Sequence, residues 1–260
     1  MRKNMSTLLA SVLCIGIVAT GCGNNGTDSE TDRGKYRLTR GGNIETYAES
    51  TEQNEKYIEQ EEYSEYEITY QNAKTWMIGE KKKVQVIVEI ENTGTTDLYL
   101  SSGSCDLEDE EGNLVSVMQY VSTYPDVISP GEKGYMYEEK TLDNYSGNGS
   151  LTVIARPDIE ESCVDYIRYD VSDVSLNDNR YGTFDIIGRI TNTSNKVCSM
   201  IYVAAIFYDD NNIPIGSGFT IITDDVDQNE KAGFEIKGTT FPDWITKENV
   251  SNYTIYAYPM

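Results

Sequence analysis

The sequence contains no histidine. This absence excludes catalysis by Ser-His-Asp and Cys-His arrangements, and it excludes zinc sites built on imidazole ligands. A glycine-rich phosphate loop after a strand is also lacking, so nucleotide binding has no support. Pairs of carboxylates can serve glycoside hydrolysis, but among 43 acidic residues some lie close together by chance. We therefore predict that the protein is not an enzyme.

Positive charge is scarce. The chain has 21 Lys and Arg against 43 Asp and Glu, which gives a formal net charge of −22. An acidic surface without a basic patch repels nucleic acid and anionic lipid headgroups. Nucleic acid is therefore excluded as a partner, and solubility and spacing from a negative cell surface explain the charge most simply.

The apolar run at the N-terminus is too short to span a bilayer. It extends from Leu8 to Thr20, follows Arg2 and Lys3, and ends in small residues. Thirteen residues cover about 20 Å at 1.5 Å per residue, whereas the hydrocarbon core is about 30 Å thick. A basic start, a brief apolar stretch and a small-residue cleavage site are typical of a secretory signal peptide.

The residues Ala19-Thr20-Gly21-Cys22 resemble the bacterial lipobox, with Ala19 where that motif favours Leu. The resemblance implies a signal peptide over 1–21 and a diacylated Cys22 as the lipid anchor on the extracytoplasmic side of the cell membrane. Cleavage there leaves 239 residues and shifts the charge to −24, because two cations and no acids are lost. The alternative is ordinary secretion, with Cys22 unmodified.

Residues 22–62 have almost no periodic apolar pattern and are rich in Gly, Asn, Thr, Ser and acids. Low hydrophobicity combined with high charge predicts a disordered acidic tether. Such a tether lifts the rest of the chain off the membrane.

Beyond the tether the pattern becomes that of β-strands and repeats itself. Apolar residues alternate at 84–90, which predicts a half-buried strand with Gln85 and Glu89 on the polar face. The alternation returns 100 residues later at 184–190. Each run ends in a similar turn, Asn92-Thr93-Gly94 in the first and Asn192-Thr193-Ser194 in the second. Each copy also ends in a similar apolar run, at 151–157 and at 253–259.

We therefore predict an all-β protein with two tandem immunoglobulin-like β-sandwich domains, at 64–158 and 163–260. Each copy shows about seven short strands separated by turn signals. No long amphipathic helix is apparent, which argues against a parallel α/β sheet.

The second copy resembles the FxLYD domain, an immunoglobulin-like module of extracytoplasmic bacterial proteins. The matching features are Gly188, the turn 192–194, Tyr208-Asp209, and Asn229-Glu230 before Phe234. Ala205 and Phe207 depart from the motif, and the first copy matches more weakly. The resemblance implies a fold and brings no general biochemical activity with it.

Three further features leave alternatives open. Cys163 and Cys198 are either a disulfide or two buried free thiols, and Cys105 is unpaired by count. Acidic turns suggest bound calcium, or are ordinary hairpin turns. These turns hold the following residues: Asp109, Glu111 and Asn113; Asp209 and Asn211; and Asp224, Asp225 and Asp227.

Aromatic residues and one apolar strand are the remaining candidates. Trp76 and Trp244 are expected to pack in the sandwich cores, with a sugar-binding platform as the alternative. The strand 198–208 is apolar on both faces, which predicts either a central strand covered on both sides or a partner surface.

Together these features predict a non-enzymatic lipoprotein that mediates protein–protein interaction or assembly at the cell envelope. The alternatives are an envelope glycan-binding module, or an accessory lipoprotein of a transporter or secretion complex. No cofactor is expected apart from the calcium considered above.

Overall fold

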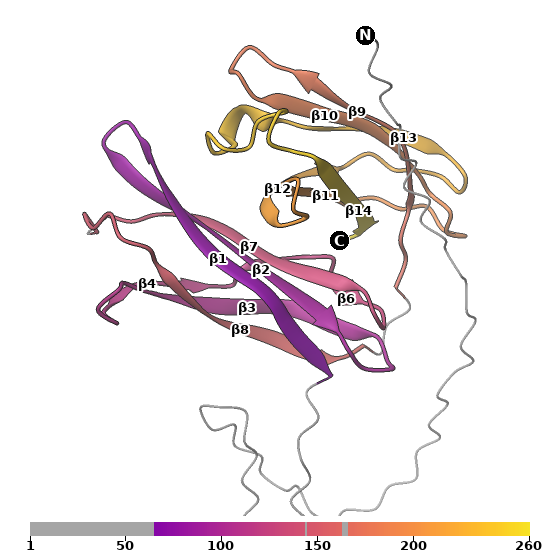
Figure 1. Ribbon diagram of the computed structural model, residues 1–260. Coiled ribbons are helices and arrows are strands. Elements are labelled where there is room, and N and C mark those ends of the chain that lie inside the picture. Colours follow the sequence, from indigo (N-terminus) through magenta and orange to yellow (C-terminus); the bar gives the residue numbers. More distant parts are fainter. Residues whose placement is uncertain (1–64, 144, 163–165) are drawn as a thin grey trace, which may run out of the picture. The chain divides into compact units, whose positions relative to one another are not determined.

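The computed structural model describes residues 65–143, 145–162 and 166–260. The predicted signal peptide, the predicted tether, Cys22 and Cys163 lie outside these residues. Within the described residues every strand pairing is antiparallel and no α-helix occurs, so the predicted all-β class is confirmed (Figure 1).

The first half of the fold, residues 66–161, contains two sheets. One has the strand order β1-β2-β7-β5, and the other consists of β4-β3-β6 with β8 pairing along the opposite edge of β3. The bounds are β1 Tyr66–Ile78, β2 Lys81–Asn92, β3 Leu98–Glu108, β4 Leu114–Gln119, β5 Ser122–Tyr124, β6 Val127–Ile128, β7 Lys133–Thr141 and β8 Thr152–Glu161. Strand β8 thus continues past residue 158, where we had placed the end of the first domain.

The second half, residues 170–259, repeats this arrangement with fewer strands. Its sheets have the orders β13-β10-β9 and β12-β11-β14. The bounds are β9 Asp170–Asp178, β10 Phe184–Thr191, β11 Ile201–Tyr208, β12 Pro214–Ile222, β13 Lys231–Ile236 and β14 Asn252–Pro259, with one 3₁₀ turn, η1, at Gly238–Thr240. The similar runs that end the two copies in the sequence, 151–157 and 253–259, lie in β8 and β14, and each of these strands pairs with the central strand of its sheet.

The two turns that follow β2 and β10 are built identically. Asn92 Nδ2 donates to the carbonyls of Thr96 (2.8 Å) and Ile128 (2.7 Å), and Asn192 Nδ2 donates to those of Lys196 (2.7 Å) and Val226 (2.8 Å). Each side-chain oxygen accepts the backbone N–H two residues later. Both amides are fully buried, so each must satisfy these backbone groups internally.

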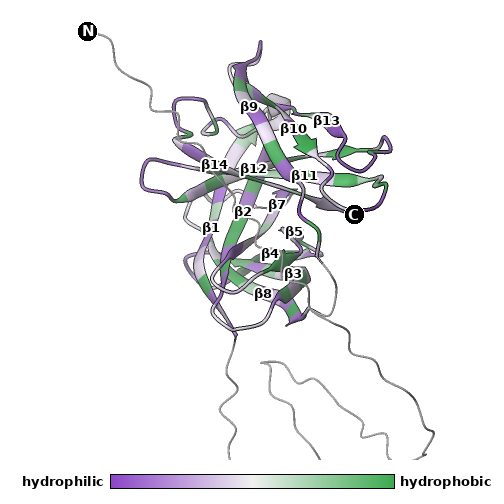
Figure 2. Cartoon of the chain, turned by 90° about the vertical axis from the view of Figure 1, so that its right-hand side faces the viewer, coloured by the Kyte–Doolittle hydropathy of each residue, from purple (hydrophilic) through white to green (hydrophobic). Residues whose placement is uncertain are grey.

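Each half has its own hydrophobic core between its two sheets. The alternating residues Val84, Val86, Val88 and Ile90 of β2 fill the first core. Residues of β10 and β11, including Phe184 and Phe207, fill the second. Figure 2 shows the hydrophobic residues concentrated along the strands, whereas the loops are mainly hydrophilic.

A third cluster joins the halves, which belong to one compact unit, Tyr63–Met260. This junction cluster consists of Tyr124 and Tyr135 from the first half and Ala204, Ile206 and Tyr208 from β11. One face of β11 therefore packs in the second core and the other in the junction. The first of the two alternatives for this apolar strand holds, because it is covered on both sides.

The junction also corrects the prediction for β2. That strand was expected to be half-buried, yet Gln85 is 2 % exposed and Glu89 is 5 % exposed. The second half covers the polar face: Gln85 Nε2 donates to the carbonyl of Ile215 at 3.0 Å. Alternation in the sequence identified the polar face correctly but did not reveal that another sheet would bury it.

Candidate functional site

The most exposed apolar segment in a strand region of the first half is β4 with the turn that follows it. Leu114 is 61 % exposed, Val117 is 37 % exposed and Tyr120, in the turn, is 82 % exposed. The whole stretch 114–124 carries no charge, in a chain of which a quarter is charged. Apolar side chains gathered on an acidic surface are typical of a protein interaction site.

Strand β4 is an edge strand, because among the described residues it pairs only with β3. The N–H of Asp109 donates to the carbonyl of Asn113, and the carbonyl of Gly103 accepts from Val121. In the part of β3 that pairs with β4, the odd-numbered residues therefore direct their backbone groups toward β4, and the pair Asp106–Val117 is not hydrogen-bonded. Consequently the N–H and C=O of Val117 point outward.

The outward carbonyl of Val117 accepts a hydrogen bond from Lys140 Nζ at 2.7 Å. Lys140 lies on β7, in the opposite sheet, and its side chain is exposed. An exposed lysine beside an edge strand is a common device that limits unwanted pairing. No described residue offers a backbone partner to this edge of β4.

The corresponding edge in the second half is covered. In β12, the carbonyl of Ile215 accepts hydrogen bonds from Gln85 Nε2 (3.0 Å) and Trp244 Nε1 (3.1 Å). Gln85 comes from the first half, so the junction satisfies this carbonyl at the edge of β12 and leaves the edge of β4 open.

The junction contains a buried polar network. Glu89 Oε1 accepts from Lys133 Nζ (2.6 Å) and Thr69 Oγ1 (2.7 Å), and Oε2 accepts from the hydroxyl of Tyr135 (3.1 Å). The hydroxyls of Tyr135 and Tyr208 are 2.7 Å apart. Burial raises the pKa of Tyr135 well above its usual value, so the phenol stays neutral. These groups are satisfied by one another, which indicates a structural role.

Aromatic rings border the junction. Tyr202 stacks on Tyr258 at 5.9 Å, and Phe219, which is 53 % exposed, lies 6.1 Å from Tyr202 and 6.2 Å from Tyr124. Burial raises the pKa of Tyr124 to about 12. A cavity of about 250 Å³ adjoins Phe219 and Tyr124, which is below the range of about 300–1,000 Å³ common for small-molecule sites.

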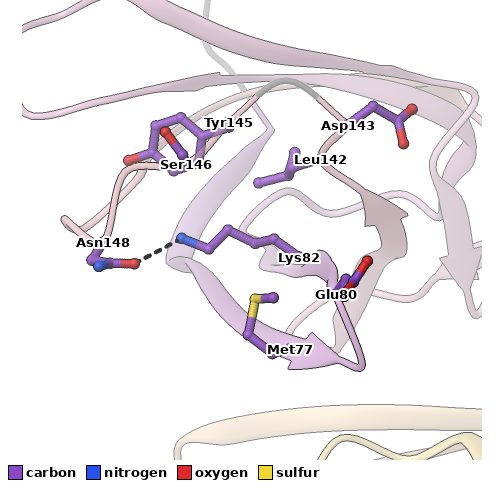
Figure 3. A pocket seen from close by; sticks show the side chains of 8 residues that line it. All are labelled: Met77, Glu80, Lys82, Leu142, Asp143, Tyr145, Ser146 and Asn148. Carbon is purple, nitrogen blue, oxygen red and sulfur yellow. Dashed lines mark hydrogen bonds between the residues drawn. The ribbon is translucent and has the colours of Figure 1, made fainter.

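A cavity of about 530 Å³ lies at one end of the first half (Figure 3). Lys82 crosses it: its ammonium donates to the carbonyl of Gly147 and to Asn148 Oδ1 (3.1 Å), and lies 5.2 Å from the centre of the Tyr145 ring. The charge of Lys82 is therefore already used to hold the surrounding loop.

The first aspartate of two of the acidic turns accepts hydrogen bonds from the backbone of its own turn. Asp109 Oδ1 accepts the N–H groups of Glu111 (3.0 Å) and Asn113 (2.9 Å), and Asp209 Oδ1 accepts those of Asn211 (2.9 Å) and Ile213 (2.8 Å). Backbone hydrogen bonds lower the pKa of both carboxyls. Across the described part of the chain, no three acids or cysteines come together as metal ligands.

The two tryptophans contact each other. Trp244 packs against the second core, as expected. Trp76 is also buried, as expected, but its ring meets Trp244 edge-on at 5.3 Å across the junction and is not part of the first core cluster. Lys74 Nζ covers the ring of Trp244 at 4.1 Å, so neither indole forms an open platform for a sugar.

The cysteines in the described residues are free thiols. Cys105 is fully buried, and burial raises its pKa to about 11. Cys198 is half-buried and accepts a hydrogen bond from the hydroxyl of Tyr169. Its proposed partner Cys163 lies outside the described residues.

The predicted anchor, Cys22, also lies outside the residues that the structure describes. No helix in the part of the chain that is described is long and apolar enough to cross a membrane.

The sequence pattern alone does not single out β4 or Lys140. The available signal was the uncharged stretch 114–124, which stands out against the charged composition. However, 211–223 is equally free of charge, and only the structure distinguishes the open edge from the covered one.

No known protein family matches the sequence, and no curated protein is significantly similar to it. The resemblance to the FxLYD domain therefore stays a prediction.

Proposed function

We propose that this protein is a lipoprotein anchored by Cys22 to the extracytoplasmic face of the cell membrane, and that it binds a protein partner at the cell envelope. The two predicted domains, 64–158 and 163–260, are immunoglobulin-like sandwiches in this proposal, the second of FxLYD type. The protein acts by binding and catalyses no reaction.

The exposed apolar surface of β4 carries this proposal. Leu114, Val117 and Tyr120 are exposed on a protein whose formal net charge is −22. Interaction surfaces commonly combine apolar and aromatic side chains at their centre with a polar rim. The acidic turn 109–111 beside β4 supplies such a rim.

In-cell photo-crosslinking tests the proposal. A photoreactive phenylalanine replaces Tyr120 in the intact protein, and captured proteins are identified by mass spectrometry. The same group at Tyr181, an exposed tyrosine in the β9–β10 turn, is the positional control. Cys22→Ala is the control for the anchor.

We expect one specific partner to be captured from position 120, but not from position 181. Its capture should be lost in the Cys22→Ala variant, because the protein is then released from the membrane. Capture of the same abundant neighbours from both positions, with or without the anchor, would contradict a protein-binding role.

A further inference from the structure

The free edge of β4 presents backbone groups in the register of a β-ladder. Val117 directs its N–H and C=O outward, and β4 has no neighbour on that side among the described residues. Strands rarely leave such an edge without a charge, a proline or a bulge to protect it. Strand β4 contains no proline and no charge of its own, and its protection consists of a bulge at Val115 and the side chain of Lys140.

The second half shows how this fold behaves when the same edge is occupied. There the outward carbonyl of Ile215 is held by the side chains of Gln85 and Trp244, which pack against β12. Positions 115 and 117 of β4 correspond to positions 215 and 217 at the repeat offset of 100 residues. The first half has the equivalent groups without an equivalent cover.

Charge decides which occupant fits. The turn before β4 contains Asp109, Glu110 and Glu111, and the mature chain carries a formal charge of −24. A second copy of the chain would bring an equal negative charge to the contact, which disfavours pairing of two β4 strands. A segment with basic residues at its ends complements the acidic turn and is attracted over longer distances.

From this geometry we infer that β4 binds an extended segment of a partner protein by strand addition. The segment has alternating apolar residues and is flanked by Lys or Arg, and one of its N–H groups replaces Lys140 at the carbonyl of Val117. Backbone hydrogen bonds supply the affinity, and Leu114 and Val117 select the side chains. This inference rests on the proposed protein-binding function and specifies the partner's chemistry.

The first test uses full-length protein in detergent micelles and hydrogen–deuterium exchange. The probe is the peptide acetyl-Lys-Thr-Val-Thr-Val-Thr-Lys-amide, and its counterpart has Glu in place of both Lys. We expect the basic peptide to slow exchange in residues 114–119, and to bind at least about tenfold more tightly than the acidic one. Equal protection by both peptides, or protection by neither, overturns the inference.

Two variants at one position separate the backbone from the side chain. Val117→Pro removes the outward N–H, which takes no part in the pairing with β3. Val117→Thr keeps that N–H and nearly the same shape. We expect the proline variant to bind the basic peptide at least about tenfold more weakly, and the threonine variant to bind it as the parent does. Equal binding by all three proteins excludes strand addition.

The same variants distinguish failure of this inference from failure of the proposed function. If the Val117→Pro variant captures the cellular partner from position 120 as well as the parent does, the protein-binding function stands but strand addition is overturned. Capture of no partner, with the peptide still protecting β4, overturns the proposed function but supports the strand-accepting edge. A dimer in sedimentation that disappears in Val117→Pro identifies a second copy as the occupant and overturns the basic partner.

Discussion

Asn92 and Asn192 show how one residue type recurs for a physical reason. Each amide is fully buried, and each donates two hydrogen bonds to carbonyls of the chain while accepting one N–H. The side chain thereby joins the turn to a segment more than 30 residues away in the chain. The sequence pattern predicts turns at these residues, and the structure shows that their side chains also connect distant parts of each half.

We predict that Asn192→Ala lowers the free energy of unfolding by about 2–3 kcal/mol, because the buried amide donates to the carbonyls of Lys196 and Val226 and accepts the N–H of Ser194, and alanine makes none of these hydrogen bonds. Chemical denaturation measures the loss. Asn195→Ala, at an exposed position in the same turn, is the control and should change stability by less than about 0.5 kcal/mol. Similar losses for both variants would contradict the role assigned to Asn192.

At the scale of elements, the hairpin turns between β3 and β4 and between β11 and β12 share one construction. A carboxylate, Asp109 or Asp209, accepts two backbone N–H groups, and the turn places Gly112 or Asn212 at a positive φ of 81° or 61°. These hydrogen bonds stabilise the ionised carboxylate, which is why the pKa of each is lowered. The carboxylates that a calcium ion would need at these turns, Asp109 and Asp209, thus already accept hydrogen bonds from the backbone.

The pKa of Asp209 predicts a pH dependence. Because the pKa is lower in the folded than in the unfolded state, Asp209 contributes stability above its unfolded pKa. That contribution is lost as the pH falls through the lower folded value. In Asp209→Asn the contribution is absent, so the urea midpoint should fall less between pH 7 and pH 3 than in the parent.

The control for this measurement is Asp225→Asn, at an exposed position in a later loop. It should lose as much stability on acidification as the parent protein. If Asp209→Asn and Asp225→Asn respond alike to acid, Asp209 makes no special contribution.

At the scale of the whole molecule, the junction makes the two halves dependent on each other. Ile206 is fully buried in the junction cluster, and Arg168 forms a bidentate ion pair with Glu132 of the first half. Burying a large aliphatic side chain contributes about 1.5–3 kcal/mol. Each half is therefore expected to stabilise the other.

We predict that the parent protein unfolds in one calorimetric transition, and that Ile206→Asp separates it into two. The carboxylate is costly to bury without a partner, so the junction opens before either core unfolds. Ile187→Asp, at an exposed position of β10, should retain a single transition. Two transitions already present in the parent would show that the junction does not couple the halves.

Much of the fold follows from local patterns. The all-β class follows from alternating apolar residues, and the repeat follows from matching strands and turns at a fixed spacing. The burial of Gln85 and Glu89 does not follow in this way, because period two specifies only which residues share a face. Whether solvent or another sheet covers that face depends on residues more than 100 positions away, such as Ile215.

The sequence by itself determined the all-β class, the duplicated strand pattern, the turn asparagines and the acidic charge, since each depends on neighbouring residues or on composition. Only the tertiary structure decided which of two similar uncharged strands remains open. Strands β4 and β12 have comparable composition, yet the junction satisfies the edge of one and not the other. That difference arises from how two sheets pack, and packing between distant segments leaves no local signal in the chain.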